Sequence, residues 1–234
     1  MTSHLELIAT KTITLPGIVQ SLPGCRPYFS GQYREVIENV GATLSILKAR
    51  KFAQVAVAFS DEEMRRRQFM DYMQTEHLGG VFIEKMLLMH AGHPAESLLR
   101  RHANDEKRHG VIFGELAGTS ACQQEGSEAY ELEMRYHEAY SRWVGNDFFS
   151  LACLLHGFEL RSAVLQCHWF TLMDMFPECE TALLRPAFSQ ISTDEVFHIT
   201  YTGRLVAEEL SRGAPPERLS AALRVAEADI DQIA

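Results

Sequence analysis

Apolar side chains recur every three or four residues along most of this 234-residue chain, from about position 32 onward. That interval places side chains on one face of an α-helix, and Val36, Val40, Leu44 and Leu47 follow it. They predict a first helix over residues 32–58. Later segments lack the alternation of apolar and polar residues that is typical of strands, so we expect an all-α protein.

Start and stop signals divide the rest of the chain into further helices. The sequence SDEE at 60–63 combines an N-cap residue with acidic residues of a first turn, and GHP at 92–94 is typical of a turn. The predicted helices cover residues 60–89, 95–117, 128–144, 148–175, from about 178 or 186 to 212, and 217–233, with a loop over 119–127.

The first 30 residues lack helical periodicity and contain several prolines and glycines. We expect them to be irregular, with a short extended segment over residues 8–15. Residues 1–14 have no signal-peptide layout, and no apolar run approaches the length of a membrane-spanning helix. We therefore expect a cytoplasmic protein with no membrane partner.

Charge and cysteine content narrow the function classes. The net charge of −9 argues against a partner bound through nucleic-acid phosphates, and the basic run over residues 65–67 is more typical of a solvated helix face than of a binding patch. The five cysteines are odd in number and form no Cys-x-x-Cys. This pattern indicates reduced, mostly buried thiols and excludes a zinc ribbon or a rubredoxin-type iron site.

A doubled motif carries the candidate chemistry. The chain reads DEKRH at 105–109 and DEVFH at 194–198. Each copy places a glutamate and a histidine three residues apart, which is one face of a helix. Each copy also follows, at the distance of a helical hairpin, a lone glutamate on another predicted helix: Glu76 in the first half and Glu159 in the second.

The lone glutamates favour a metal site over an accidental pattern. Glu159 lies in a strongly apolar helix, where an unpaired buried charge would be very costly. Metal coordination removes that cost, and a salt bridge with Arg161 or Arg185 is the alternative. Glu84 competes with Glu76 on the same helix, but Glu76 lies at nearly the same distance from the turn as the first Glu-x-x-His.

The resulting donor set contains four carboxylates and two imidazoles, which suit iron or manganese. Bridging carboxylates would hold two ions close enough to bind one O2 between them. We expect the metal ligands, which are also the catalytic residues, to be Glu76, Glu106, His109, Glu159, Glu195 and His198.

Other residues are expected to tune these ligands. Asp105 and Asp194 lie one turn before the histidines, where each could accept the ring N–H of the ligand histidine of the other motif. Tyr72, His102 and His156 lie about one turn from expected ligands. Each is expected either to tune the metal ligands or, as the simpler alternative, to pack in the core. The small residues Ser162, Ala163, Ser192 and Thr202 would leave room for substrate.

The order lone Glu, Glu-x-x-His, lone Glu, Glu-x-x-His resembles the ferritin-like di-iron carboxylate superfamily over about residues 60–211. The resemblance implies a four-helix bundle within one domain, with an N-terminal extension and helix over residues 1–58 and a C-terminal helix over 217–234. The Asp-Glu-x-x-His form is similar to that of di-iron monooxygenase hydroxylase subunits and arylamine N-oxygenases. However, Ile191 stands where the latter carry an extra histidine.

That resemblance implies a non-haem oxygenase or oxidase with two iron ions, manganese or a mixed pair being the alternative, that uses O2 to oxidise a small organic substrate. The chain has no flavin, nicotinamide or iron–sulfur motif, so electrons would come from a reductase, a ferredoxin or a small reductant. A ferritin- or rubrerythrin-like protein that oxidises iron or reduces peroxide is the alternative, and a bundle with accidental motifs is a third. A monomer and a homodimer both remain open.

Overall fold

The computed structural model describes residues 4–9, 13–119, 127–179 and 182–228. Within these ranges the regular secondary structure is helical and contains no strand, which confirms the all-α prediction. The chain divides into two compact units. Among the described residues, unit 1 combines those within 1–59 and 147–228, and unit 2 contains those within 60–146.

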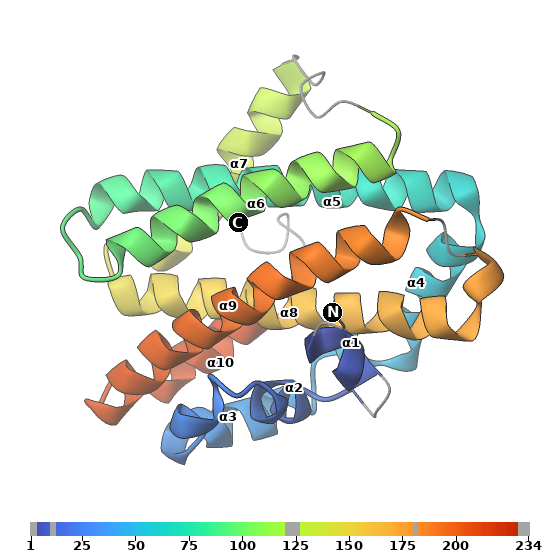
Figure 1. Ribbon diagram of the computed structural model, residues 1–234. Helices are drawn as coiled ribbons and strands as arrows, with labels where there is room; N and C mark the ends of the chain where they lie inside the picture. The colour runs from blue at the N-terminus through green and yellow to red at the C-terminus, as the bar shows by residue number, and fades with distance from the viewer. Residues whose placement is uncertain (1–3, 10–12, 120–126, 180–181, 229–234) are drawn as a thin grey trace. The chain divides into compact units, whose positions relative to one another are not determined.

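Unit 2 is built on a hairpin of two long helices, α5 (Glu62–Met89) and α6 (Glu96–Leu116), which run side by side in opposite directions (Figure 1). Asp61 begins α5, because its carboxylate accepts the N–H of Met64 at 2.8 Å. The third helix of the unit, α7 (Ser127–Val144), packs against α5. Phe82 of α5 meets the rings of Tyr136 and Tyr140 edge to face there.

Glycine allows α5 and α6 to approach closely. A Cβ at Gly80 would lie 2.8 Å from the carbonyl oxygen of Ala103, and a Cβ at Gly110 would lie 3.1 Å from that of Met73. A side chain at Gly80 would force the two backbones apart. The close contact matters for the candidate site because Glu76 and the Glu106–His109 motif lie on these two helices.

Unit 1 contains the second long hairpin, α8 (Phe148–Met175) and α9 (Leu184–Ser211), joined through the short 3-10 turn η3 (Pro177–Cys179) (Figure 1). Trp169 is fully buried and packs its ring on Phe188 across the hairpin, at 5.2 Å between centroids. The last helix, α10 (Pro216–Val225), packs on α8. It ends at Val225, and residues 229–233 of the predicted helix lie outside the described residues.

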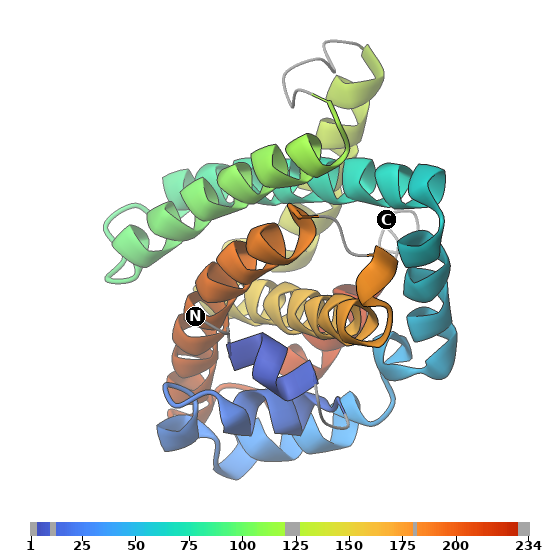
Figure 2. The same cartoon turned by 45° about the vertical axis from the view of Figure 1, so that its right-hand side comes forward.

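The N-terminal region also belongs to unit 1, and the prediction of an irregular segment with an extended stretch is wrong. It contains α1 (His4–Ala9), α2 (Leu15–Ser21), η1 (Arg26–Tyr28) and α3 (Gly31–Gly41), which gather beside α9 and α10 (Figure 2). Thr14 begins α2 by accepting the N–H of Gly17 at 3.0 Å. Pro16 is tolerated because it lies in the first turn, where its missing N–H has no helical partner.

The single helix predicted over residues 32–58 is also wrong. The chain leaves α3 at Gly41, forms η2 (Ser45–Leu47) and re-enters a helix as α4 (Ala49–Ser60). Glu227 stabilises the break, because its carboxylate accepts the backbone N–H groups of Ser45 at 2.9 Å and Ile46 at 2.7 Å. Glu227 follows α10, so local periodicity gave no sign of this contact.

The helix α8 corrects the expectation that no apolar run approaches the length of a membrane-spanning helix. Among the described residues it is the helix that is long and apolar enough to cross a membrane, with a mean hydropathy of 1.4 over 18 residues. However, 72% of that window is buried inside the protein, as expected for the central helix of a folded unit.

The thiols were expected to be reduced and mostly buried, and Cys25, Cys153 and Cys167 are buried and form no disulfide. Cys122 and most of the predicted loop over 119–127 lie outside the described residues.

Candidate metal-binding residues

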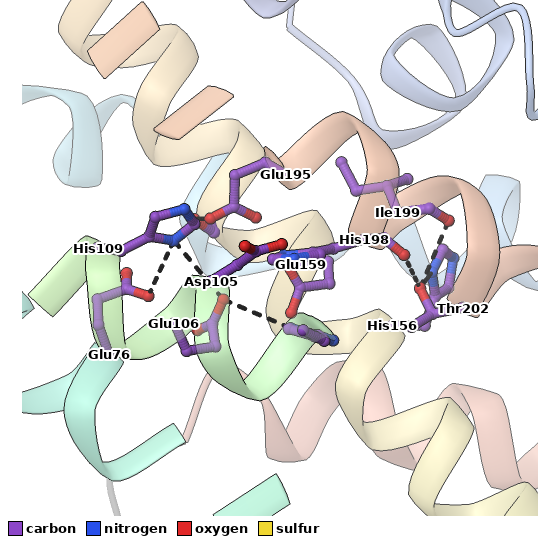
Figure 3. Close-up of polar contacts among 12 residues, drawn as sticks. Glu76, Asp105, Glu106, His109, His156, Glu159, Glu195, His198, Ile199 and Thr202 are labelled. Atoms are coloured by element: carbon purple, nitrogen blue, oxygen red, sulfur yellow. Dashed lines mark hydrogen bonds and ion pairs between the residues drawn. The ribbon is translucent and has the colours of Figure 1, made fainter. Parts of the chain in front are cut away.

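Unit 2 brings one lone glutamate and one Glu-x-x-His together. The Nδ1 atom of His109 lies 3.7 Å from a carboxylate oxygen of Glu76 on α5 and 3.6 Å from one of Glu106 on α6 (Figure 3). One ligand atom from each of the three residues lies within 4.8 Å of those from the other two. We call these residues the unit 2 set.

The spacing in the unit 2 set suits a cation better than a direct hydrogen bond. Separations of 3.6 and 3.7 Å are too long for a good N–H···O bond, which is about 2.7–3.2 Å. Two donors that each lie about 2.0–2.2 Å from one ion are separated by roughly 3–4 Å. The imidazole and the two carboxylates are therefore spaced and chemically suited to hold a metal ion.

Glu84, the competitor of Glu76 on α5, has another partner. It forms an ion pair of 2.6 Å with Lys107 of α6, and its side chain is 45% exposed. Glu76 is the more shielded of the two, with 15% of its side chain exposed. The structure thus places Glu76 at His109 and Glu84 in a surface ion pair.

Of the tuning residues predicted in unit 2, His102 lies next to the set. His102 is buried, and its Nε2 atom lies 3.4 Å from Glu106, so it adds a second imidazole to the same carboxylate. Asp105 pairs with Arg108 at 2.7 Å on its own helix, while its predicted bond to a histidine of the other motif stays a prediction. The ring of Tyr72 packs 5.1 Å from that of Phe113 between α5 and α6.

Unit 1 carries the remaining ligand candidates on its long hairpin: Glu159 on α8, and Glu195 and His198 on α9. The Nδ1 atom of His198 on α9 lies 3.4 Å from a carboxylate oxygen of Glu159 on α8 (Figure 3). Glu195 stands one turn before His198 and accepts a hydrogen bond of 3.1 Å from Ser162 of α8. All three ligand candidates are buried, and we call them the unit 1 set. Arg185, considered above as a salt-bridge partner of Glu159, pairs with Glu6 and Asp174.

Ser162 and Ser192 form hydrogen bonds within the hairpin, while the expectation that they leave room for substrate stays a prediction. Ser162 donates to Glu195, and Ser192 donates at 2.5 Å to the side-chain oxygen of Gln166. Gln166 was not predicted from the sequence. A buried amide two turns from Glu159 on an apolar helix was the available signal, because such a group needs hydrogen-bond partners.

His156 has a structural role, because both of its ring nitrogens are engaged. Thr202 donates its only proton to the carbonyl oxygen of His198 at 2.7 Å, so its hydroxyl oxygen accepts the Nδ1–H of His156 at 2.9 Å. The other nitrogen, Nε2, therefore accepts the hydroxyl proton of Tyr33 at 2.8 Å. Burial lowers the pKa of His156 to about 4 and raises that of Tyr33, which keeps both groups neutral.

This arrangement ties the N-terminal region to a ligand-bearing helix. Tyr33 belongs to α3, while Thr202 and the backbone of His198 belong to α9. Gly203 makes the room, since a Cβ there would lie 3.0 Å from the ring of His156 and 3.1 Å from the Tyr33 hydroxyl. No sequence pattern linked position 33 to position 156, so only the folded chain reveals Tyr33.

Comparison with known proteins adds no relative. No protein-family model, no curated protein and no solved structure matches the chain. The chemistry of the two sets therefore rests on the residues themselves.

Proposed function

We propose that this protein is an O2-activating oxygenase or oxidase of the ferritin-like di-iron type, which binds two iron ions through the unit 1 and unit 2 sets and oxidises a small organic molecule. The observation that carries the proposal is the repeated donor geometry. Each unit presents the imidazole Nδ1 of a Glu-x-x-His at 3.4–3.7 Å from the carboxylate of a lone glutamate on the adjacent helix.

The chemical type of the donors supports iron over structural zinc or calcium. Structural zinc sites are rich in cysteine, whereas calcium sites are built from oxygen donors alone. Four carboxylates with two imidazoles balance the charge of two divalent ions, and the histidine and carboxylate donors suit redox-active iron or manganese. When bound, iron would supply the electrons that O2 requires.

The protein's own residues have defined tasks in this proposal. Glu76, Glu106, Glu159 and Glu195 supply negative charge, and His109 and His198 direct Nδ1 toward the carboxylates. The hydrogen bonds around His156 and Glu195 fix the helix backbone and side chains that bear the ligands. An external donor would return electrons after each turnover.

Iron binding by matched variants of α5 tests the metal part of the proposal. Purified protein loaded with Fe(II) under argon should retain two ions per chain. The variant Glu76→Ala should lose iron, whereas Glu84→Ala should retain it, because Glu84 pairs with Lys107 at the surface. Replacing His198 by Ala should likewise lower iron content. Wild-type protein with only trace iron, or equal iron in the two α5 variants, would refute the assignment.

Turnover distinguishes the proposed oxygenase from the alternative. The iron-loaded, reduced protein is exposed to O2 with a set of small aromatic and aliphatic amines and hydrocarbons, and products are identified by mass spectrometry. An oxygenated product that depends on His198 supports the proposal. Iron accumulation in a cage, or peroxide consumption without any organic product, would instead identify a ferritin- or rubrerythrin-like activity.

A further inference from the structure

A continuous chain of hydrogen bonds within unit 1 ends on Glu195. Ser192 of α9 donates to the side-chain oxygen of Gln166 at 2.5 Å, and the amide nitrogen of Gln166 donates to Ser162 at 3.2 Å. Ser162 in turn donates to Oε1 of Glu195 at 3.1 Å. The chain thus starts on α9, crosses to α8, follows one turn of that helix and returns to α9.

The bond from Ser162 to Glu195 fixes the direction of the other two bonds in this chain. An ionised carboxylate can only accept, so Ser162 must give it the one hydroxyl proton that it has. The oxygen of Ser162 then accepts, and Gln166 must turn its NH2 group toward it. This orientation leaves the amide oxygen of Gln166 facing Ser192, which donates. Only one arrangement of the two hydroxyls and the amide satisfies all three contacts.

Burial makes the arrangement stiff. Gln166 is 3% exposed and Ser192 is fully buried, so neither group can exchange its partner for bulk water. The last bond ends on a charge, and charge-assisted hydrogen bonds are about twice as strong as neutral ones. An apolar residue would have filled position 166 without needing any partner. Instead, both the oxygen and the nitrogen of the Gln166 amide form a hydrogen bond.

We infer that Ser162, held in place by Gln166, is a positioning residue that fixes the carboxylate of Glu195 for metal binding. This inference rests on the proposed function, because it assigns Glu195 to a metal. The bond from Ser162 engages Oε1 and so sets the rotation of the carboxylate before the ion arrives. Partners that orient ligands in this way change metal affinity by about 10- to 100-fold when they are removed.

The test measures metal affinity directly. The full-length protein is titrated with Co(II) under argon, followed by visible absorption, and Fe(II) affinity is obtained by competition. Ser162→Ala should weaken binding by about 10-fold and change the Co(II) spectrum, because the bond that orients Oε1 of Glu195 is then lost. Ser162→Thr retains the hydroxyl and should restore both the affinity and the spectrum, which a purely structural role would not require.

Two further variants test the pathway. Gln166→Met has a similar volume and removes both amide contacts, so it should weaken binding less than Ser162→Ala. In the Ser162→Ala background it should add nothing, because the two residues act through one contact. Thr171→Val is the control. This substitution deletes a hydroxyl nearer the C-terminal end of α8, which donates to the carbonyl oxygens of Ala9 and Cys167. The variant should bind Co(II) like the wild type.

The outcomes separate this inference from the proposed function. If wild-type protein binds no Co(II) or Fe(II), the metal assignment itself fails. If wild-type protein binds metal but Ser162→Ala matches it in affinity and spectrum, the positioning role is wrong while the metal site stands. Additive effects of the Ser162 and Gln166 substitutions would likewise overturn the single pathway.

Discussion

At the scale of single residues, unit 1 buries two histidines in neutral form for different reasons. His156 is bonded at both ring nitrogens. His168 packs edge to face on Phe52 at 5.3 Å, and its Nδ1 atom has no hydrogen-bond partner among the described residues. Burial, together with the nearby positive charge of Lys51, lowers the pKa of His168 to about 4.

We therefore predict acid sensitivity from His168. The unfolded chain takes up a proton on this residue near pH 6.5, whereas the folded protein resists it until about pH 4. Stability is thus fully present above pH 6.5 and falls as pH drops toward 4. The loss is on the order of 1–3 kcal/mol for this residue. Urea unfolding at a series of pH values measures it.

The variant His168→Leu should reduce this pH dependence, because it removes one of the two buried neutral histidines and leaves the contribution of His156. It should also be at least as stable as the wild type at pH 7, since it removes a buried polar atom that lacks a partner. Thr171→Val on the same helix should keep the wild-type slope. An unchanged slope in His168→Leu would show that other groups cause the acid sensitivity.

At the scale of elements, the α5–α6 hairpin depends on close backbone contacts at Gly80 and Gly110. Gly80→Ala would place a methyl group 2.8 Å from the carbonyl oxygen of Ala103. We predict that it destabilises the protein by about 1–3 kcal/mol, the usual effect of overpacking. It should also lower metal content, because the shift separates Glu76 from His109. Denaturant unfolding and metal analysis measure the two effects.

The adjacent glycine provides the matched control. A methyl group at Gly79 would meet only Glu106, at an ordinary 3.5 Å. Gly79→Ala should therefore be neutral or stabilising by up to about 1 kcal/mol, because alanine is the better helix former. Equal stability of Gly79→Ala and Gly80→Ala would contradict the close contact between α5 and α6.

Elements with local signals were predictable from the sequence, and those set by distant contacts were not. The predicted ranges of α5, α6 and α8 agree with the structure to within two residues at each end, because caps such as Asp61 and Asp147 mark their starts. The break after α3 was missed, since the carboxylate that stabilises it belongs to Glu227. In the same way, helical spacing identified Glu76, but Tyr33 is brought to His156 only by the fold.

At the scale of the whole molecule, bound metal should raise stability. A ligand that binds only the folded protein adds about 2.7 kcal/mol when its free concentration is 100 times Kd. Each unit carries its own donor set, so each should be stabilised. We predict a higher melting temperature with Fe(II) under argon than with a chelator. Calorimetry of wild-type protein and of a His109→Ala, His198→Ala double variant tests this.

The double variant should melt at the same temperature with iron or with the chelator, because it has lost both imidazole ligands. An equal response to iron in the wild type and the double variant would show that the ions bind elsewhere. If the wild-type protein melts at the same temperature with Fe(II) and with the chelator, the prediction that iron binds the folded state is contradicted.

The bond between Tyr33 and His156 has a consequence for how the chain can be shortened. The segment that precedes α5 looks dispensable, because its residues contribute no candidate ligand. Yet Leu5, Leu15 and Ile18 are fully buried, and Tyr33 closes a hydrogen-bonded path to the carbonyl oxygen of His198. A truncated gene that begins at residue 60 would therefore encode a protein with bare apolar surface on α8 and α9 and a histidine without its phenol. The minimal working unit of this protein includes its N-terminal helices.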